Sequence, residues 1–257
     1  MCARALRTWH AVLVVDRQFR EPRTAALYDR FCEGRPDFEF YLPFVMQANK
    51  VLDVGCGSGR LLHLAREAGH TGHLCGIDPA GAMLEVARAR SDIEWLSGDL
   101  ASAHWNQEFD LVVMTGHAFQ VLLDDDEIRA ALAAVYRALT DDGFFAFETR
   151  NPSVRTWETW TPANAMEILS DTGSVVHMEH QFDTPVDPRF ASFTTSFASP
   201  DWDAPVLSRS TLRFLTVSEL RSFLSAAHLK VIGRFGDWDR RPYTDASPEI
   251  ITVVSRV

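Results

Sequence analysis

The stretch VLDVGCGSGR, residues 51–60, combines residue types and a spacing that could bind a ligand. Asp53 stands two positions before Gly55, and further glycines follow at Gly57 and Gly59. Glycine lets the backbone come close to a ligand because it has no side chain, and loops of this kind hold a dinucleotide, a phosphate or a nucleoside. The spacing of the glycines and the charge beside them discriminate among these ligands.

Spacing excludes the phosphate loop and argues against a dinucleotide. A phosphate-binding loop needs Lys followed by Ser or Thr after its last glycine, whereas Arg60 and Leu61 follow here. A nicotinamide fingerprint has its third glycine five residues after the first, but Gly59 lies only four residues after Gly55. The carboxylate of Asp53 would repel a pyrophosphate and would suit an ammonium group. We therefore favour a nucleoside linked to an amino acid, with a nicotinamide dinucleotide as the alternative.

Further polar residues follow the next two predicted strands. The run 73–77 ends at Asp78, and residues 93–96 precede Gly98 and Asp99. In a doubly wound sheet, ligands bind at the carboxyl ends of the strands, near the point where the strand order reverses. These residues are therefore expected at the same edge of the sheet as the glycine loop.

In this order, the motifs resemble the class I S-adenosylmethionine-dependent methyltransferase family of small-molecule type, from about residue 28 to residue 152. The resemblance implies that Asp53 and the glycine loop contact the methionine part of S-adenosylmethionine, that Asp78 binds the ribose hydroxyls and that residues 98–100 contact the adenine. A carboxylate, as a bidentate acceptor, suits a ribose diol. The cofactor-binding residues implied are Tyr28, Asp53, Gly55, Cys56, Gly57, Gly59, Asp78, Pro79, Met83, Gly98, Asp99, Leu100, Thr115 and Gly116.

Simpler structural roles stay open for some of these residues. Asp78, next to Pro79, could cap a helix, although its position after the second strand favours the ribose role. Met83 could be a core residue at helical spacing instead of an adenine contact. Cys56 fits a small filler of the loop better than a nucleophile.

The stretch MTGHAFQ, residues 114–120, is the best candidate for the reacting end of the site. The backbone of Thr115 and Gly116 is expected to face the sulfonium, and His117 is predicted to act as a base or to orient the acceptor. The alternative for His117 is a hydrogen bond within its own loop. Tyr28 resembles a lid tyrosine that reaches the carboxylate of the cofactor, or it is a core aromatic.

The acceptor pocket is expected between this stretch and a cap. Its predicted residues are Tyr28, His117, Gln120, Arg150, Asn151, Trp157 and Trp160. Aromatic residues at the start of a cap are also what its own packing requires. His177, Glu179 and His180 do not predict a metal site, because residues 177 and 179 share one face of a strand and residue 180 takes the other.

Strands that alternate with helices must position these residues. From residue 51 to residue 149 the pattern predicts a parallel sheet covered on both faces. Within it, acids at 124–126 begin a helix, and residues 141–143 make a turn into a fifth strand, Phe144–Thr149. The expected fold class is α/β, a doubly wound seven-stranded Rossmann-like sheet with an inserted antiparallel β cap that contains strands at 175–182, 190–197 and 210–215.

These elements divide the chain into five predicted parts. Residues 1–22 form an N-terminal extension, expected to be poorly ordered, and residues 23–48 form a helical lid. The cofactor-binding core comprises residues 49–152, the inserted cap residues 153–215, and the C-terminal helix with the last two strands residues 216–257.

Composition narrows the class of protein. The 257 residues carry 25 basic and 35 acidic side chains, and the net charge of -10 disfavours nucleic acid and an anionic membrane surface as partners. Four cysteines without a paired spacing indicate reduced thiols and a cytoplasmic location. A monomer or a homodimer is expected.

The sequence therefore predicts an enzyme that transfers a methyl group from S-adenosylmethionine to an oxygen or nitrogen of a small-molecule acceptor, such as a natural-product or amino-sugar-like compound. Two alternatives stay open. One is a lyase or isomerase that binds S-adenosylmethionine without transferring its methyl group, and the other is a nicotinamide-dependent oxidoreductase. A binding protein without turnover is a weaker reading.

Overall fold

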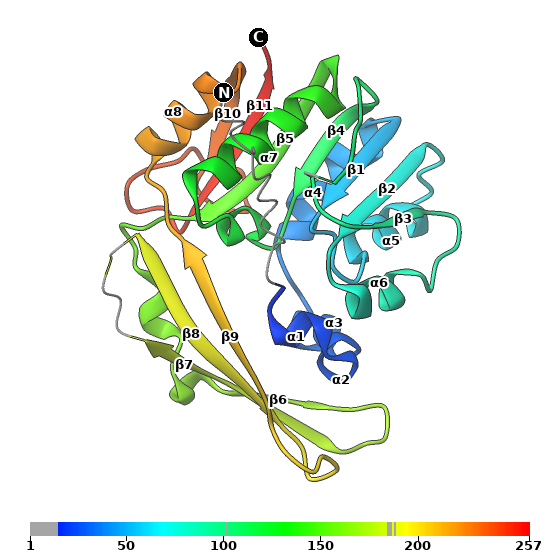
Figure 1. Cartoon of the computed structure of the whole chain (residues 1–257), viewed down its shortest axis with the longest axis vertical. Coiled ribbons are helices and arrows are strands. Elements are labelled where there is room, and N and C mark those ends of the chain that lie inside the picture. Colours follow the sequence, from blue (N-terminus) through cyan, green and yellow to red (C-terminus); the bar gives the residue numbers. More distant parts are fainter. Residues whose placement is uncertain (1–14, 101, 184–186, 188) are drawn as a thin grey trace, which may run out of the picture.

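The computed structural model describes residues 15–100, 102–183, 187 and 189–257. Its larger sheet has the strand order β10-β11-β5-β4-β1-β2-β3 (Figure 1). Neighbouring strands are parallel except at β11, which is antiparallel to both β5 and β10. The strands are β1 (Lys50–Val54), β2 (His73–Asp78), β3 (Glu94–Ser97), β4 (Phe109–Met114), β5 (Leu139–Arg150), β10 (Leu229–Phe235) and β11 (Glu249–Arg256). This order confirms the expected doubly wound seven-stranded sheet, whose strand order reverses between β1 and β4.

Helices cover both faces of this sheet. Alternate residues of one strand enter different cores: Val112 packs on the side of α7 (Asp125–Ala138) and α8 (Val217–Ala226), whereas Val113 packs on the side of α4 (Asp37–Gln47) and α5 (Arg60–Glu67). Successive side chains of a strand point to opposite faces, so both must be apolar in a covered sheet. No described helix has the length and apolar character needed to cross a membrane.

The cap is a separate four-stranded antiparallel sheet, in the order β6-β7-β8-β9. It comprises β6 (Met166–Leu169), β7 (Val175–Asp183), β8 (Phe190–Ala198) and β9 (Val206–Arg213), preceded by the short helices η2 (Thr156–Thr159) and η3 (Pro162–Asn164). The predicted strand at 210–215 was placed too late, because β9 begins at Val206. Ser208 and Ser210 are buried on the inner face of β9, so the apolar pattern hides its start.

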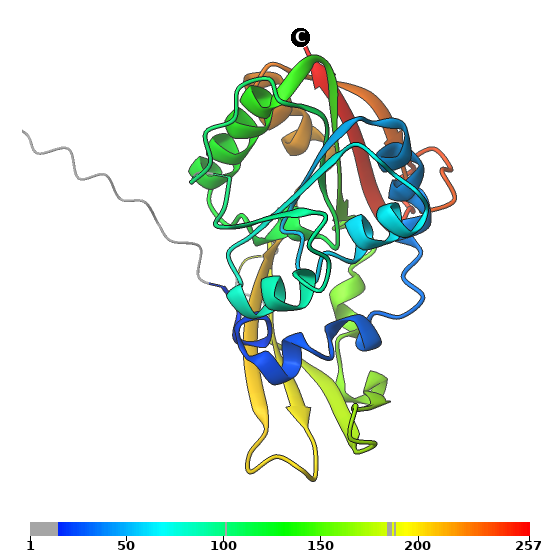
Figure 2. The same cartoon turned by 90° about the vertical axis from the view of Figure 1, so that its right-hand side faces the viewer.

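Those two serines join the cap to the lid. The Gln18 amide donates to Ser208 Oγ over 2.9 Å, and the Ser210 hydroxyl donates to Asp16 Oδ2 over 2.5 Å. The lid contains α1 (Arg17–Arg20), α2 (Pro22–Ala25) and α3 (Tyr28–Phe31), and both views place it between the core and the cap (Figure 1 and Figure 2). The expectation of a poorly ordered extension is therefore wrong for residues 15–22, while residues 1–14 lie outside the described part.

Two boundaries in the core also differ from the expectation. Residues 141–143 were predicted as a turn, but they lie within β5, which already pairs with β4 at Phe109 and Leu139. The register then shifts to pair Leu111 with Phe144, and this irregularity absorbs the polar residues. The second helix of the core, α6 (Gly81–Ala87), begins two residues after Pro79 and not at it.

Gly76, within β2, tests how closely this sheet packs. A Cβ there would lie 2.5 Å from the Trp95 ring and 2.8 Å from the Cys56 sulfur. We expect Gly76→Ala to lower the free energy of unfolding in urea by about 1–3 kcal/mol, because the added methyl group overpacks the core. Gly81→Ala is the matched control, since a Cβ at Gly81 meets nothing within 4 Å. Equal stability of the two variants would contradict the assigned packing.

Candidate cofactor and acceptor site

The glycine loop connects β1 to α5. Gly55, Gly57 and Gly59 have φ angles of +70°, +55° and +73°, a region that side chains rarely adopt. The Gly55 and Cys56 amides both donate to the carbonyl oxygen of Ile77, over 2.8 and 3.2 Å. A Cβ at Gly59 would lie 2.3 Å from the Trp95 ring, so this glycine serves packing as well as backbone shape. Cys56 is buried, as expected of a filler.

Asp53, near the end of β1, carries a buried acceptor that none of the described residues satisfies. Its carboxyl group is almost completely buried, and Oδ1 has no hydrogen-bond partner among the described residues. Burial and, to a smaller extent, the nearby Asp78 raise the pKa of Asp53 to about 7, while Arg35 opposes the shift. A buried acceptor without a donor is costly, and a ligand cation would remove this cost. The ammonium group of S-adenosylmethionine fits this position.

Asp78 meets the glycine loop from the end of β2. Its Oδ2 accepts from the Gly57 amide over 2.8 Å, and its Oδ1 accepts from the Ala80 amide over 2.7 Å. The helix cap that the sequence left open for Asp78 is not formed, because α6 begins at Gly81 with Ala80 as its N-cap, and the contact with the Ala80 amide closes a turn before the helix. Burial raises the pKa of this carboxyl group. Each carboxylate oxygen keeps a second lone pair, so these contacts are compatible with accepting ribose hydroxyls.

A cavity of about 900 Å³ extends from the glycine loop toward the cap. It brings together predicted residues from three segments, namely Gly55, Pro79 and residues 98–100. Ala118 and the apolar side chains of Val54, Ile77, Met114 and Leu122 complete its lining. Apolar walls with a few polar groups are typical of small-molecule sites of this size. The described residues therefore fit an adenosine group.

Met83 does not line this cavity. It is buried in a small cluster with Ala25 and Ala80, and its methyl group lies 3.2 Å from where a Cβ of Gly57 would be. The structure thus shows the core role that the sequence left open, and we do not retain the adenine contact for Met83.

The other side of the glycine loop faces a narrow cleft under the lid. It is lined by Tyr28, Asp53, Thr115 and Gly116, together with Arg35. Sequence reasoning missed Arg35, although it lies between Gly34 and Pro36, where the lid helix is interrupted. Its guanidinium forms an ion pair with Asp37 and lies 3.4 Å from the Tyr28 hydroxyl. The cleft therefore presents a cation, a phenol and a buried carboxylate to one ligand.

His117 follows β4 in a left-handed conformation, with φ of 62°. Its amide donates to Glu148 Oε1 over 2.6 Å, and its Nε2 lies 3.0 Å from Glu249 Oε2. Glu148 Oε2 also accepts from the Tyr41 hydroxyl over 2.5 Å. Glu148 therefore joins the lid helix α4 to the loop after β4, while Glu249 contacts the imidazole.

Sequence reasoning missed both glutamates and Tyr41. Each lies in a run that reads as apolar core, such as FFAFET around Glu148 and PEIITVV around Glu249. An acidic residue within an otherwise apolar run was the only sequence feature that could have identified these glutamates. Such an acid, if buried, needs hydrogen-bond partners, and the fold supplies them.

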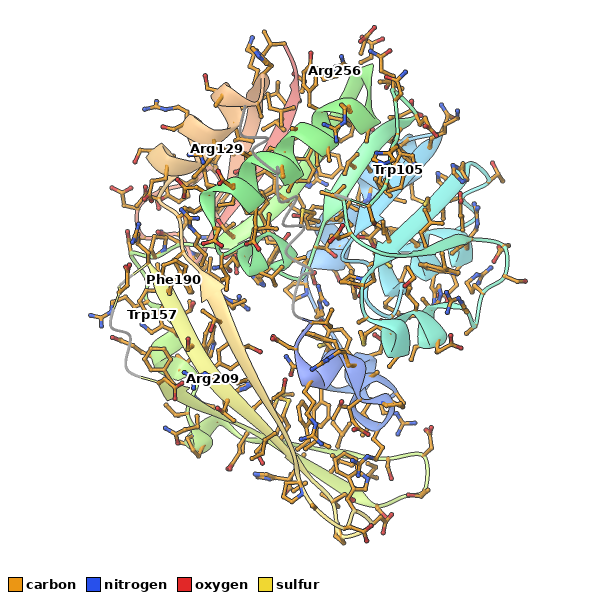
Figure 3. All side chains as sticks on the ribbon, viewed as in Figure 1. Trp105, Arg129, Trp157, Phe190, Arg209 and Arg256 are labelled. Atoms are coloured by element: carbon orange, nitrogen blue, oxygen red, sulfur yellow. The ribbon has the colours of Figure 1, made fainter. Side chains whose placement is uncertain are left out.

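The structure separates the predicted acceptor-side residues. Arg150 stacks its guanidinium 5.3 Å from the centre of the Trp160 ring, so these two lie together where cap and core meet. Trp157 lies inside the cap against Phe214 (Figure 3). The side-chain amide of Asn151 donates to the carbonyl oxygens of Asp245 and Ser247. We therefore retain Arg150 and Trp160 as candidates and assign Trp157 and Asn151 to structural contacts.

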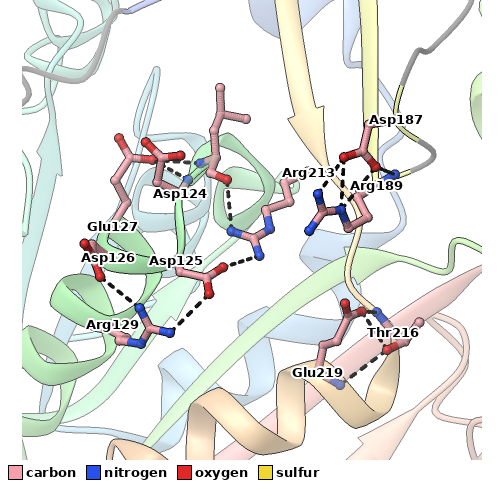
Figure 4. Close-up of polar contacts among 11 residues, drawn as sticks. Asp124, Asp125, Asp126, Glu127, Arg129, Asp187, Arg189, Arg213, Thr216 and Glu219 are labelled. Carbon is pink, nitrogen blue, oxygen red and sulfur yellow. Dashed lines mark hydrogen bonds and ion pairs between the residues drawn. The ribbon is translucent and has the colours of Figure 1, made fainter.

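Gln120 belongs to the junction between cap and core. Its amide nitrogen donates to the Arg213 carbonyl over 2.9 Å, and its oxygen accepts from the Arg150 amide and guanidinium. Arg213, at the end of β9, donates to Leu123 O and Asp125 Oδ1 (Figure 4). Because Gln120 is buried and used in this way, it fixes the wall of the large cavity and is not retained as a substrate contact.

The histidines of β7 point to opposite faces, as predicted. His177 contacts Glu167 and Glu179, whereas His180 Nδ1 lies 3.0 Å from Thr195 Oγ1. Within the described part of the chain, no cluster of His, Cys, Asp and Glu has the arrangement of a metal site.

Substitutions of Glu148 test whether its hydrogen bonds to the His117 amide and the Tyr41 hydroxyl stabilise the site. We expect Glu148→Ala to lower the free energy of unfolding by about 2–4 kcal/mol, because it leaves two buried donors unpaired and opens a cavity. Glu148→Gln should cost less than about 1 kcal/mol, since its amide oxygen can accept from the His117 amide and its nitrogen can donate to Tyr41. Urea unfolding measures both variants. Similar losses in the two would show that the hydrogen bonds do not support the site.

Comparison with known proteins agrees with this geometry. Residues 51–143 match a family model described as a methyltransferase domain. A cypemycin N-terminal methyltransferase from Streptomyces sp. is 24% identical over 214 residues, which cover 82% of this chain and 84% of the relative. Another curated relative is 31% identical over 111 residues, and the chain spans only 43% of its length.

Solved structures share the fold over most of the chain. The CcbJ methyltransferase from Streptomyces caelestis superimposes with a TM-score of 0.72 at 21% identity, covering 91% of this chain and 96% of that one. CalS10, an amino pentose methyltransferase from Micromonospora echinaspora, superimposes with a TM-score of 0.65 at 21% identity, covering 90% and 95%. At this identity the similarity concerns the fold.

Proposed function

The chain belongs to the class I S-adenosylmethionine-dependent methyltransferases, and we propose that it transfers a methyl group from S-adenosylmethionine to an oxygen or nitrogen of a small-molecule acceptor. The observation that carries this proposal is the buried, unpaired Oδ1 of Asp53 beside the glycine loop. When bound, S-adenosylmethionine supplies a methyl group activated by its sulfonium and leaves as S-adenosylhomocysteine.

The described residues would hold this cofactor by complementary charge. Asp53 pairs with its ammonium group, and Arg35 with Tyr28 binds its carboxylate from the lid. Asp78 accepts the ribose hydroxyls, and the segment 98–100 borders the adenine. The cofactor is thereby enclosed between the lid and the sheet, which excludes water from the reacting end.

The acceptor would bind between Thr115, Gly116 and His117 on the core side and Arg150 with Trp160 on the cap side. Orientation of the acceptor supplies most of the acceleration, because the methyl group is already activated. We propose a natural-product or amino-sugar-like acceptor, supported by fold-level similarity to the amino pentose methyltransferase. In this proposal the helices from α1 to α4 act as the lid, which extends the predicted range 23–48 toward the N-terminus, and residues 153–215 act as the substrate cap.

We further propose that the protein works in the cytoplasm, as a monomer or homodimer, without nucleic acid. The net charge of -10 argues against nucleic acid as a partner, and the free thiols of Cys32, Cys56 and Cys75 favour the cytoplasm.

Calorimetry with S-adenosylhomocysteine and with a nicotinamide dinucleotide tests the cofactor. We expect binding of the first alone, with an affinity that rises with pH through about 7, because Asp53 must be ionised to pair with the ammonium group. Asp53→Asn should weaken binding about 10- to 100-fold and flatten this pH dependence.

Asp110→Asn is the matched control for this experiment. Asp110 accepts from the Asn49 and Lys50 amides at the other edge of the sheet, and Asn retains an acceptor there. Tight binding of the dinucleotide without S-adenosylhomocysteine would overturn the cofactor assignment. Release of S-adenosylhomocysteine in proportion to methylated product separates a methyltransferase from a lyase or isomerase.

We expect His117→Ala to lower turnover about 10- to 100-fold while leaving the affinity for S-adenosylhomocysteine nearly unchanged. The acceptor for this assay comes from a screen of amino sugars and hydroxylated small molecules, with S-adenosylhomocysteine release as the readout. Unchanged turnover would remove His117 from the mechanism.

A further inference from the structure

Glu249 is placed to control the imidazole of His117. It is the first residue of β11, and it pairs in register with Arg150 of β5. Because β11 runs antiparallel to β5, its first residue lies at the same sheet edge as the end of β4. Glu249 is buried, and its Oε2 lies 3.0 Å from His117 Nε2.

His117 is fixed at two points. Glu148 holds its backbone through the amide, and Glu249 contacts one ring nitrogen, so neither the loop nor the ring is free to turn. Among the described residues, no hydrogen-bond partner reaches the other ring nitrogen, Nδ1. A carboxylate on one nitrogen of an imidazole decides which tautomer the ring adopts.

We propose that Glu249 is a positioning residue that directs a lone pair of His117 to Nδ1, where it receives the proton of the acceptor. This inference rests on the proposed methyl transfer. Ionised Glu249 accepts from Nε2–H, and Nδ1 is then unprotonated. The proton leaves the acceptor O–H or N–H bond for Nδ1, and the electron pair of that bond stays on the acceptor atom. The resulting imidazolium is stabilised by the carboxylate of Glu249.

Protonation of Glu249 reverses this arrangement. Its O–H then donates to Nε2, so that the remaining proton sits on Nδ1 and the ring offers no base there. The pair therefore has to lose one proton before it can accept one from the acceptor.

The charged groups around Glu249 and His117 set the pH at which the pair loses this proton. Arg150 and Glu148 face the pair from β5, Asp237 from the loop before β11, and Arg35, Asp37 and Tyr41 from the lid. Burial raises the pKa of Glu249 to about 8, with Arg150 opposing this shift and Glu148 adding to it. Burial, followed by Arg150 and Arg35, holds the pKa of His117 well below its usual value. The base form is thus expected to increase as the pH rises through about 8.

Nitrogen-15 NMR of histidine-labelled full-length protein tests this pairing without any acceptor. The His117 resonances are assigned by their loss in His117→Ala. In the wild type, we expect Nδ1 to change from protonated to unprotonated as the pH rises through about 8. Glu249→Gln should abolish this transition because an amide does not titrate, and Glu249→Asp should retain it.

Glu167→Gln is the matched control, because it removes an exposed carboxylate 3.4 Å from His177. It should leave the His117 resonances unchanged. Identical His117 titrations in the wild type and in Glu249→Gln would overturn the inference. If no acceptor is methylated, the proposed function fails while the NMR result still decides the pairing.

Kinetics provide the second readout. At saturating S-adenosylmethionine, where the Asp53-dependent binding of the cofactor does not contribute, the wild-type kcat/KM for the acceptor should rise about tenfold per pH unit below pH 8 and then level off. Glu249→Gln should remove this dependence. A Glu249→Gln enzyme with an unchanged pH profile would show that the glutamate only supports the fold.

Discussion

Burial of several carboxyl groups at one edge of the sheet is the constraint on which the rest of the structure depends. Asp53, Asp78, Glu148 and Glu249 lie at or near the ends of β1, β2, β5 and β11 on this edge, and each is at most 8% exposed. Removing ionised carboxylates from water is costly unless donors or cations surround them. The lid and the junction with the cap supply those partners, so the architecture around the sheet follows from the chemistry at its edge.

The lid has two functions in this arrangement. Tyr41 satisfies Glu148, and Arg35 places a cation beside Asp53. Asp53 nevertheless keeps one oxygen that has no partner among the described residues, and in the proposed function a ligand cation pairs with it. In the proposed function, the lid residues and the ligand cation therefore act on the same charges, because each lowers the cost of burying them.

Several parts of the site were predictable because they depend on local constraints. The glycine loop at 55–59 needs positive φ angles and close packing, and only glycine provides both without strain. Strands followed by Asp53 and Asp78 are recognisable from a short apolar run that ends in an acid.

Other parts could not be predicted because their partners are distant in the chain. Glu148 and Tyr41 are 107 residues apart, and His117 and Glu249 are 132 residues apart. Gln120 and Asn151 look like ligand-binding groups in sequence, yet the fold uses them to join segments. The sequence by itself determined the alternation of strands and helices, the strand ends and the family resemblance, since these follow from neighbouring residues. Only the tertiary structure decided which buried charges meet, because burial and pairing depend on segments that the sheet brings together.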